Sequence, residues 1–209
     1  MAGRRLKAAE RRASILAVAR VLFADQGYHG VSVDDIARRL GVSPAVLYRH
    51  FESKAALYEA VLEEMTARRQ SYIDAALAGP DDFGSVLRRM AQVFAANLAR
   101  DPDYLRMEMQ AALEGGETWQ RFFRHRWKSF TDFIEEHLRE RAREGHPVAV
   151  TPVVASTLFQ GMIREALYAK CVQEDERFRH LEVPALVDQL ITLFLRAIGE
   201  TEGAPPTSA

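Results

Sequence analysis

The spacing of apolar residues constrains the fold of this chain more than any other feature. Apolar side chains recur three and four positions apart along almost the whole sequence, and no segment alternates strictly between apolar and polar residues. The first pattern is typical of amphipathic helices and the second of strands. The sequence therefore predicts an all-α protein of about nine helices.

The breaks in this pattern place three helices in the first quarter of the chain. One is predicted over 11–25, with Gly27 just beyond its end as a cap. Ser32 and Asp35 form a capping-box-like pair at the start of a second helix, which ends at Gly41. A third helix begins at Pro44, because proline suits the first helical position.

The remaining breaks are Gly, Pro and capping residues. Further helices are predicted over 54–77, 82–99, 103–113, 117–143, 152–173 and 183–198. The basic first eight residues and the polar tail are expected to be disordered. We expect an N-terminal arm with three short helices over 1–54, a helical body over 55–199, and a disordered tail over 200–209.

Charge is divided unevenly along the chain. Residues 1–54 hold ten Lys or Arg and five Asp or Glu, a charge of +5, so the remaining residues carry −6 of the net −1. A basic front on an acidic body indicates that the front meets a polyanion. No apolar run is long enough for a membrane span and no secretory signal is visible, so the expected location is the cytoplasm, without a membrane partner. The single cysteine, Cys171, excludes an internal disulfide.

Two short helices joined by a turn at Gly41 are typical of a helix-turn-helix, whose second helix enters the major groove of DNA. In the helix that begins at Pro44, helical spacing puts Ala45, Tyr48 and Arg49 on one face. Leu47 and Phe51 are predicted to point into the core, with Val46 and His50 on a flank. A small residue for close approach and donors for phosphates are what a groove-facing surface needs.

Residues 14–62 closely resemble the DNA-binding domain of TetR-family transcriptional regulators. The matching segments are Leu22-Phe23 with Gly27-Tyr28, Ser32-Val-Asp-Asp-Ile-Ala, Gly41-Val-Ser43, Leu47-Tyr48-Arg49-His50-Phe51, and Ser53-Lys54 with Leu57. The resemblance implies DNA contacts from Ser32, Ser43, Pro44, Ala45, Tyr48, Arg49, His50 and Lys54. Val46 departs from the family pattern, where Thr is frequent. Other roles stay open for three of them: Tyr48 can shield the helix junction, His50 can cap or pack locally, and Lys54 can be a solvated first-turn residue.

The basic residues before the first predicted helix leave two interpretations open. They can reach the minor groove or phosphates of DNA, or form a solvated tail. They are Arg4, Arg5, Lys7, Arg11 and Arg12.

The acidic body is expected to form a dimer and to bind an effector. The family resemblance implies a two-fold dimer built by the last two helices, through apolar faces that include Val154, Leu158, Leu186, Leu190 and Phe194. Aromatic, Met and amide side chains are expected to line an apolar effector pocket. They are Phe94, Asn97, Met109, Gln110, Trp119, Phe123, Trp127, Phe159 and Met162. The alternative for both sets is ordinary core packing.

These features together indicate a sequence-specific regulator of transcription. Its N-terminal arm and helix-turn-helix DNA-binding domain are expected over 1–54, and its helical effector-binding and dimerisation domain over 55–199. The expected form is a homodimeric repressor released from a palindromic double-stranded operator by a small hydrophobic or amphipathic effector. The alternative is a DNA-binding regulator or architectural protein without a small-molecule ligand. The six histidines are scattered and no catalytic or phosphate-binding motif occurs, so an enzyme, a metal site and a cofactor are not expected.

Overall fold

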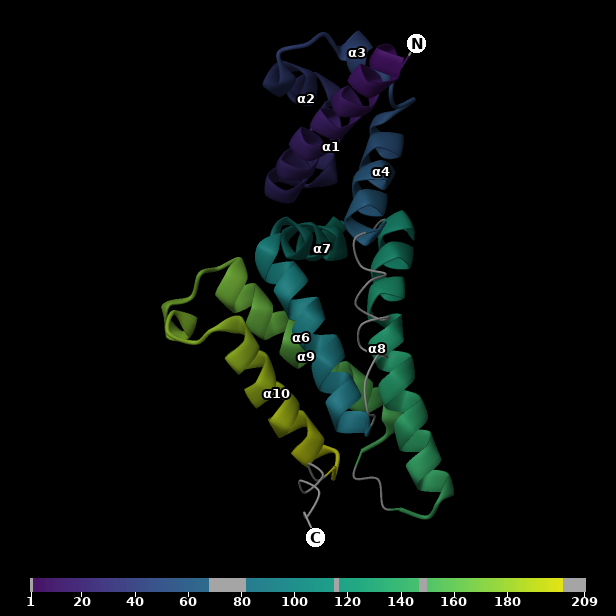
Figure 1. The fold of residues 1–209 in the computed structure, drawn as a ribbon, viewed down its shortest axis with the longest axis vertical. Helices are drawn as coiled ribbons and strands as arrows, with labels where there is room; N and C mark the ends of the chain where they lie inside the picture. The colour runs from purple at the N-terminus through teal and green to yellow at the C-terminus, as the bar shows by residue number, and fades with distance from the viewer. Residues whose placement is uncertain (1, 68–81, 115–116, 147–149, 201–209) are drawn as a thin grey trace. The chain divides into compact units, whose positions relative to one another are not determined.

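The protein is all-helical in the part of the chain that the structure, a computed structural model, describes (Figure 1). That part comprises residues 2–67, 82–114, 117–146 and 150–200, without the side chains of 2–7, 66–67, 114 and 117–126. The described residues form nine α-helices and one short 3-10 helix, and include no strand. The predicted fold class is therefore confirmed.

The helices divide into two compact units that do not follow the order of the chain. The first unit combines Met1–Arg69 with Asp103–Gln120, and the second combines Gln70–Pro102 with Arg121–Ala209. The predicted functional boundary at residue 54 stays a prediction.

Four helices from the N-terminal part build the first unit, which we call the head. They are α1 (Ala2–Gly30), α2 (Val33–Leu40), α3 (Pro44–Tyr48) and α4 (Lys54–Ala67), and they are coloured purple to blue in Figure 1. Helix α1 packs against both α2 and α4. The head core includes buried Ile15, Ala19 and Phe23 from α1, with Ile36 from α2 and Leu57 from α4. The three residues of α1 recur at helical spacing, as the sequence predicts.

Helix α7 (Asp103–Glu114) completes the head although it follows α6 in the sequence. It packs on α1 through buried Leu105 and through a hydrogen bond from Gln110 Nε2 to the Ala24 carbonyl, 2.9 Å long. An ion pair of 3.4 Å joins Arg20 on α1 to Asp103 at the start of α7. A segment from the predicted body thus belongs to the same compact unit as the helix-turn-helix.

The second unit, which we call the body, is a bundle of long helices. Its elements are α6 (Phe83–Arg100), α8 (Glu117–Arg143) from Arg121 onward, α9 (Pro152–Cys171), the 3-10 helix η1 (Glu176–Phe178) and α10 (Val183–Ala197). Helix α6 packs on α9 and α10, which also contact each other. The α-helices of the body each bury apolar residues in the bundle interior, which is the arrangement that the sequence periodicity favours.

A chain of aromatic rings runs through the body core. Phe94 of α6 lies 4.9 Å from Trp127 and 5.3 Å from Phe130 of α8, measured between ring centroids. Phe130 in turn lies 5.3 Å from Phe159 of α9, and Phe159 lies 5.2 Å from Phe194 of α10. Aromatic pairs at these separations add to the stability that area burial provides.

The predicted helix boundaries hold with a few differences. Helix α1 begins at Ala2 rather than near residue 11. The helix predicted over 54–77 is described only as far as Ala67, and 68–81 lie outside the described residues. The turn predicted at Gly27 is present, with φ of 74°, but helical hydrogen bonding continues beyond it to Gly30.

Candidate nucleic-acid interface

The N-terminus of α2 is fixed by a reciprocal capping box. Ser32 Oγ accepts a hydrogen bond of 3.1 Å from the Asp35 amide, and Asp35 Oδ2 accepts one of 3.0 Å from the Ser32 amide. The Ser32 hydroxyl also donates to the same carboxylate oxygen. Because this cap satisfies otherwise unpaired amides, it is worth about 1 kcal/mol.

The Asp35 carboxylate carries a lowered pKa. The hydrogen bond from the Ser32 hydroxyl is the main cause of the lower pKa, followed by the Ser32 amide, with Arg38 contributing at 2.9 Å. The cap therefore favours the ionised form of Asp35, whose carboxylate holds the start of α2.

The turn between α2 and α3 depends on Gly41. Its φ of 68° lies in the left-handed region that favours glycine, and the Val42 amide closes the turn on the Ala37 carbonyl at 3.0 Å. Ser43 and Pro44 then begin α3, and the Ser43 side chain makes no capping hydrogen bond. The exposed Ser43 hydroxyl remains available to an external partner.

Helix α3 has one buried face and one exposed face. Leu47 is 1% exposed and Phe51 is buried, so these two side chains anchor the helix on the head. Tyr48 is 54% exposed, and Ala45 and Arg49 are also exposed. The structure therefore places every predicted groove-facing side chain of α3 on the outside.

A surface hollow of about 400 Å³ lies between α3 and the start of α2. It is lined by His29, Gly30, Val31, Ser32, Val33, Asp34, Asp35, Tyr48 and Lys54. The structure thus brings together Ser32, Tyr48 and Lys54, three of the predicted DNA contacts. His50 lies on the other flank, half-buried, with its ring 6.5 Å from that of Phe51.

Lys54 has an internal role that the sequence analysis did not predict. Its ammonium donates hydrogen bonds to the carbonyls of Tyr28, at 2.9 Å, and Val31, at 3.0 Å, and lies 4.3 Å from the Tyr28 ring centroid. An ammonium has three donors, so one remains for an external acceptor. The phosphate contact of Lys54 stays a prediction alongside this observed structural role.

The sequence reasoning did not identify two contacts, made by Tyr28 and Arg12, that hold the core of the head behind the interface. Tyr28 packs against Tyr58 at 4.9 Å between ring centroids, and the Arg12 guanidinium lies 4.5 Å from the Phe51 ring centroid. Each pair joins segments that are far apart in the sequence, so no local spacing could have indicated either contact.

The residues predicted to line an effector pocket fall in both compact units. Met109 and Gln110 lie on α7 in the head, where Gln110 bonds to α1. Phe94, Trp127 and Phe159 are buried in the aromatic chain of the body. Asn97 and Met162 are half-buried, and the side chains of Trp119 and Phe123 lie outside the described part of the chain. An effector pocket formed by this set stays a prediction.

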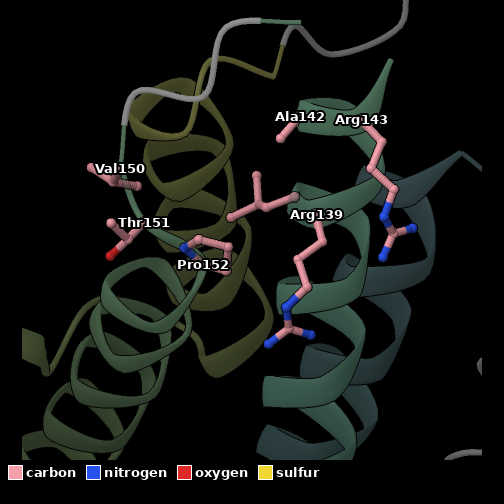
Figure 2. Close-up of a pocket in the computed structure, with 7 residues that line it drawn as sticks. Arg139, Ala142, Arg143, Val150, Thr151 and Pro152 are labelled. Carbon is pink, nitrogen blue, oxygen red and sulfur yellow. The ribbon is translucent and has the colours of Figure 1, made fainter. Parts of the chain in front are cut away.

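A different hollow, of about 530 Å³, lies between the end of α8 and the start of α9 (Figure 2). Its lining consists of Leu138, Arg139, Ala142, Arg143, Val150, Thr151 and Pro152. Figure 2 shows the Arg143 guanidinium turned away from Val150 and Pro152, and that group pairs with Glu136 at 3.1 Å. None of these lining residues belongs to the predicted effector pocket.

The residues predicted for the dimer interface separate into two groups. On α9, Val154 is 54% exposed and Leu158 is 46% exposed, which leaves both available to a partner. On α10, Leu186 and Phe194 are buried in the core of the chain itself and Leu190 is half-buried. The large apolar residue of α10 that is exposed is instead Leu193, at 59%, because its position on the helix points away from the bundle.

Within the described ranges, every helix is too short or too polar to cross a membrane. The same ranges contain no cluster of three or more His, Cys, Asp or Glu side chains with the arrangement of a metal site.

Comparison with known proteins locates the similarity first in the head. Residues 15–61 match the family described as bacterial regulatory proteins, tetR family. The transcriptional activator FasR of Mycolicibacterium smegmatis is 39% identical over 105 residues, which span 50% of this chain and 48% of FasR. The match therefore covers about half the length of that relative.

Other similarities extend over most of the chain. The nucleoid occlusion factor SlmA of Photobacterium profundum is 30% identical over 164 residues, 77% of this chain and 84% of that protein. A TetR-like regulator from Rhodococcus sp. RHA1 superposes with a TM-score of 0.72 at 19% identity, over 91% of this chain and 97% of the other. FadR from Bacillus subtilis, in complex with stearoyl-CoA, superposes with a TM-score of 0.68 at 16% identity, over 89% and 98%. With its exposed helix-turn-helix, its helical body and these relatives, the chain belongs to the TetR family of DNA-binding transcriptional regulators.

Proposed function

We propose that this regulator works as a homodimer that represses transcription from a palindromic operator and releases it when a hydrophobic or amphipathic small molecule binds the body. The observation that carries the proposal is the exposed face of α3, where Tyr48 and Arg49 stand outside while Leu47 anchors the helix. One such helix reads too few base pairs for useful specificity, so two copies about 34 Å apart are needed to address successive major-groove faces.

Base reading falls on few side chains of α3. Pro44 and Ala45 carry no hydrogen-bonding groups, so the exposed Ser43 hydroxyl and the Arg49 guanidinium are the groups that can discriminate bases. Tyr48, Lys54 and Ser32 surround the start of α2 and suit phosphates. Much of the specificity then comes from half-site spacing and DNA shape.

The dimer contact is assigned to α9 and α10. Val154 and Leu158 on α9 and Leu193 on α10 are large apolar side chains that the single chain leaves exposed. Gly161 follows Leu158 by three positions on α9, and a Cβ built there meets no atom within 4 Å. A glycine inside a helix costs about 1 kcal/mol relative to alanine. Close packing of a partner helix against Gly161 would offset this cost, and it would explain why a glycine stands here.

The effector is assigned to the apolar class from the composition of the body core. Phe94, Trp127 and Phe159 offer large aromatic faces. Asn97 follows Phe94 by three positions on α6, and Met162 follows Phe159 by three positions on α9. The fold is shared with FadR, which binds stearoyl-CoA, an amphipathic thioester. Because the rings pack on one another in this structure, an effector has to separate them, and this would couple binding to helix movement.

A second function is favoured by a specific observation. SlmA, described as a nucleoid occlusion factor, matches over 84% of its length. The second candidate is therefore a DNA-binding regulator or architectural protein that has no small-molecule ligand. The aromatic residues of the body would then serve only as core.

The test combines DNA selection with ligand screening. Duplexes bound by the full chain are selected from a random pool, and the enriched site is expected to be a palindrome. Acyl-CoA thioesters, free fatty acids and apolar drugs are then tested for a rise in thermal midpoint and for a loss of DNA affinity, because a ligand of the folded state raises the midpoint. A ligand that binds without changing DNA affinity contradicts the effector proposal, and enrichment of no site contradicts the operator proposal.

A further inference from the structure

The N-terminal arm of α1, residues 2–12, is a helix that carries five cations. They are Arg4, Arg5, Lys7, Arg11 and Arg12, with Glu10 as the single acidic residue. We propose that this basic arm is a second DNA-contacting surface, which binds phosphates flanking the bases that α3 reads. The inference rests on the DNA-binding function proposed above.

The charge of the basic arm opposes its own helix. The helix macrodipole places partial positive charge at the N-terminus of a helix, where further positive charge is unfavourable. No acidic residue lies in the first turn of α1, and Lys7 and Arg11 are four positions apart, the spacing at which like charges repel. This arrangement is unfavourable in the free protein and becomes favourable beside a polyanion.

Arg12 holds the basic arm against the segment that joins α3 to α4. Its guanidinium carbon lies 4.5 Å from the centroid of the ring of Phe51, a buried residue three positions after the end of α3 at Tyr48. A cation over a ring face leaves the N–H groups at its edge free to donate. Among the described residues, no acceptor hydrogen-bonds to Arg12, and its side chain is exposed.

The register of α1 explains the direction in which this charge is presented. Ala19 and Phe23 form part of its buried stripe, and Arg12 stands seven positions before Ala19 on the same side of the helix. The stripe therefore changes from apolar to cationic where α1 passes beyond the head core. Figure 1 shows this N-terminal end of α1 beside α3, at the end of the head opposite α7.

A phosphate partner fits these groups better than base edges do. Five cations lie within eleven residues of the arm, which contains no amide or hydroxyl side chain, and such a dense run of cations matches the spacing of successive phosphates. The hydroxyl of Ser14, just beyond the arm, is occupied because it donates to the Glu10 carbonyl at 2.9 Å. Phosphate contacts add affinity equally on all sequences and make it dependent on salt. The basic arm thus contributes affinity and orientation, while α3 contributes selectivity.

The test is the salt dependence of DNA binding by the full-length protein. The double variant Arg11→Gln with Arg12→Gln is titrated by fluorescence anisotropy against a duplex selected by the wild-type protein and against a scrambled duplex of equal length. The slope of log affinity against log KCl concentration is expected to shrink by about 0.9 per lost phosphate contact, or about 1.8 per subunit. The two duplexes are expected to lose affinity by the same factor.

Matched variants separate this role from net charge and from packing. Arg139→Gln with Arg143→Gln removes the same charge from exposed positions of α8 in the body and is expected to leave the slope unchanged. Arg11→Gln alone, which leaves the Phe51 contact intact, is expected to reduce the slope by about 0.9, and Arg12→Lys to retain the wild-type slope.

An unchanged slope in the double arm variant overturns the inference, as does an equal loss in the α8 control. If the wild-type protein does not prefer the selected duplex over the scrambled one, the proposed function fails instead. If the wild-type protein prefers the selected duplex but the double arm variant shows an unchanged salt slope, only the proposed role of the basic arm is rejected.

Discussion

Lys54 and Tyr28 are joined twice, because the Lys54 ammonium donates to the Tyr28 carbonyl at 2.9 Å and lies 4.3 Å from the centroid of the Tyr28 ring. A further hydrogen bond of 3.0 Å reaches the Val31 carbonyl. Lys54 is the first residue of α4, whereas Tyr28 and Val31 flank the passage from α1 to α2. One side chain therefore fixes three helices of the head relative to one another.

Replacing Lys54 by methionine is expected to lower the free energy of unfolding by about 1–3 kcal/mol. The substitution keeps the aliphatic stem but leaves two carbonyls without their charged donor, and part-buried hydrogen bonds to charged groups have this value. Urea unfolding at neutral pH measures the change. Lys128→Met is the matched control, because Lys128 is an exposed residue paired with Asp132, and a change of less than about 0.5 kcal/mol is expected there. Equal effects of the two substitutions would argue against the role of Lys54 in joining the helices.

Arg49→Ala is expected to weaken binding to the selected duplex by about tenfold or more while the thermal midpoint stays within a degree or two of wild type. The guanidinium is exposed at the end of α3, and loss of one base or phosphate contact costs about 1–3 kcal/mol. A gel-shift titration at fixed salt gives the affinity. Arg38→Ala provides a comparison, since that exposed arginine already pairs with Asp35 on α2. Unchanged affinity of Arg49→Ala would remove this residue from the interface.

The local features of the head could be predicted from sequence because each depends on neighbouring residues. The capping box of Ser32 and Asp35, the left-handed Gly41 and the inward Leu47 all follow from spacing within one or two turns. The Arg12 and Lys54 contacts could not be predicted, because they join residues 39 and 26 positions apart in the sequence and depend on how the helices pack.

The same distinction explains the outcome in the body. Periodicity identified the apolar faces of α9 and α10 but not which apolar residues point inward. Leu186 and Phe194 are covered by neighbouring helices, whereas Leu158 and Leu193 are not. A wide apolar stripe can serve the core and a partner at once, and only the packing of the bundle divides it.

Leu158→Asp and Leu193→Asp are each expected to convert a dimer into monomers. Both side chains are large, apolar and exposed on the single chain, at 46% and 59%, and a carboxylate buried in an apolar interface is strongly unfavourable. Sedimentation velocity at micromolar concentration measures the change in mass, and operator affinity is expected to fall with it. Leu113→Asp on α7, where the leucine is 89% exposed, is the control and is expected to leave the mass unchanged. Dimers that survive both substitutions on α9 and α10 would place the interface elsewhere.

Glu200 joins the end of α10 to α8, and this contact predicts a dependence of stability on pH. His137 Nε2 lies 2.6 Å from Glu200 Oε1, and Arg141 donates to the same oxygen and, at 3.4 Å, to the Gly199 carbonyl. Burial raises the pKa of Glu200, but the hydrogen bonds and charges of His137 and Arg141 outweigh it, so that the net pKa is lowered. A lowered pKa in the folded state means that the ionised carboxylate stabilises the fold.

This stabilisation is fully present above the pKa of an unfolded glutamate, about 4.3, and is lost as the pH falls through the lower pKa of the folded state. Glu200→Gln is therefore expected to lower the free energy of unfolding by about 1 kcal/mol at pH 7, with the difference from wild type shrinking as the pH falls below about 4. Urea unfolding at a series of pH values measures both curves. Glu140→Gln, at an exposed position of α8, is the matched control and is expected to run parallel to wild type. A difference between Glu200→Gln and wild type that stays constant from pH 7 to pH 3 would mean that the ionised carboxylate contributes nothing beyond what the amide supplies.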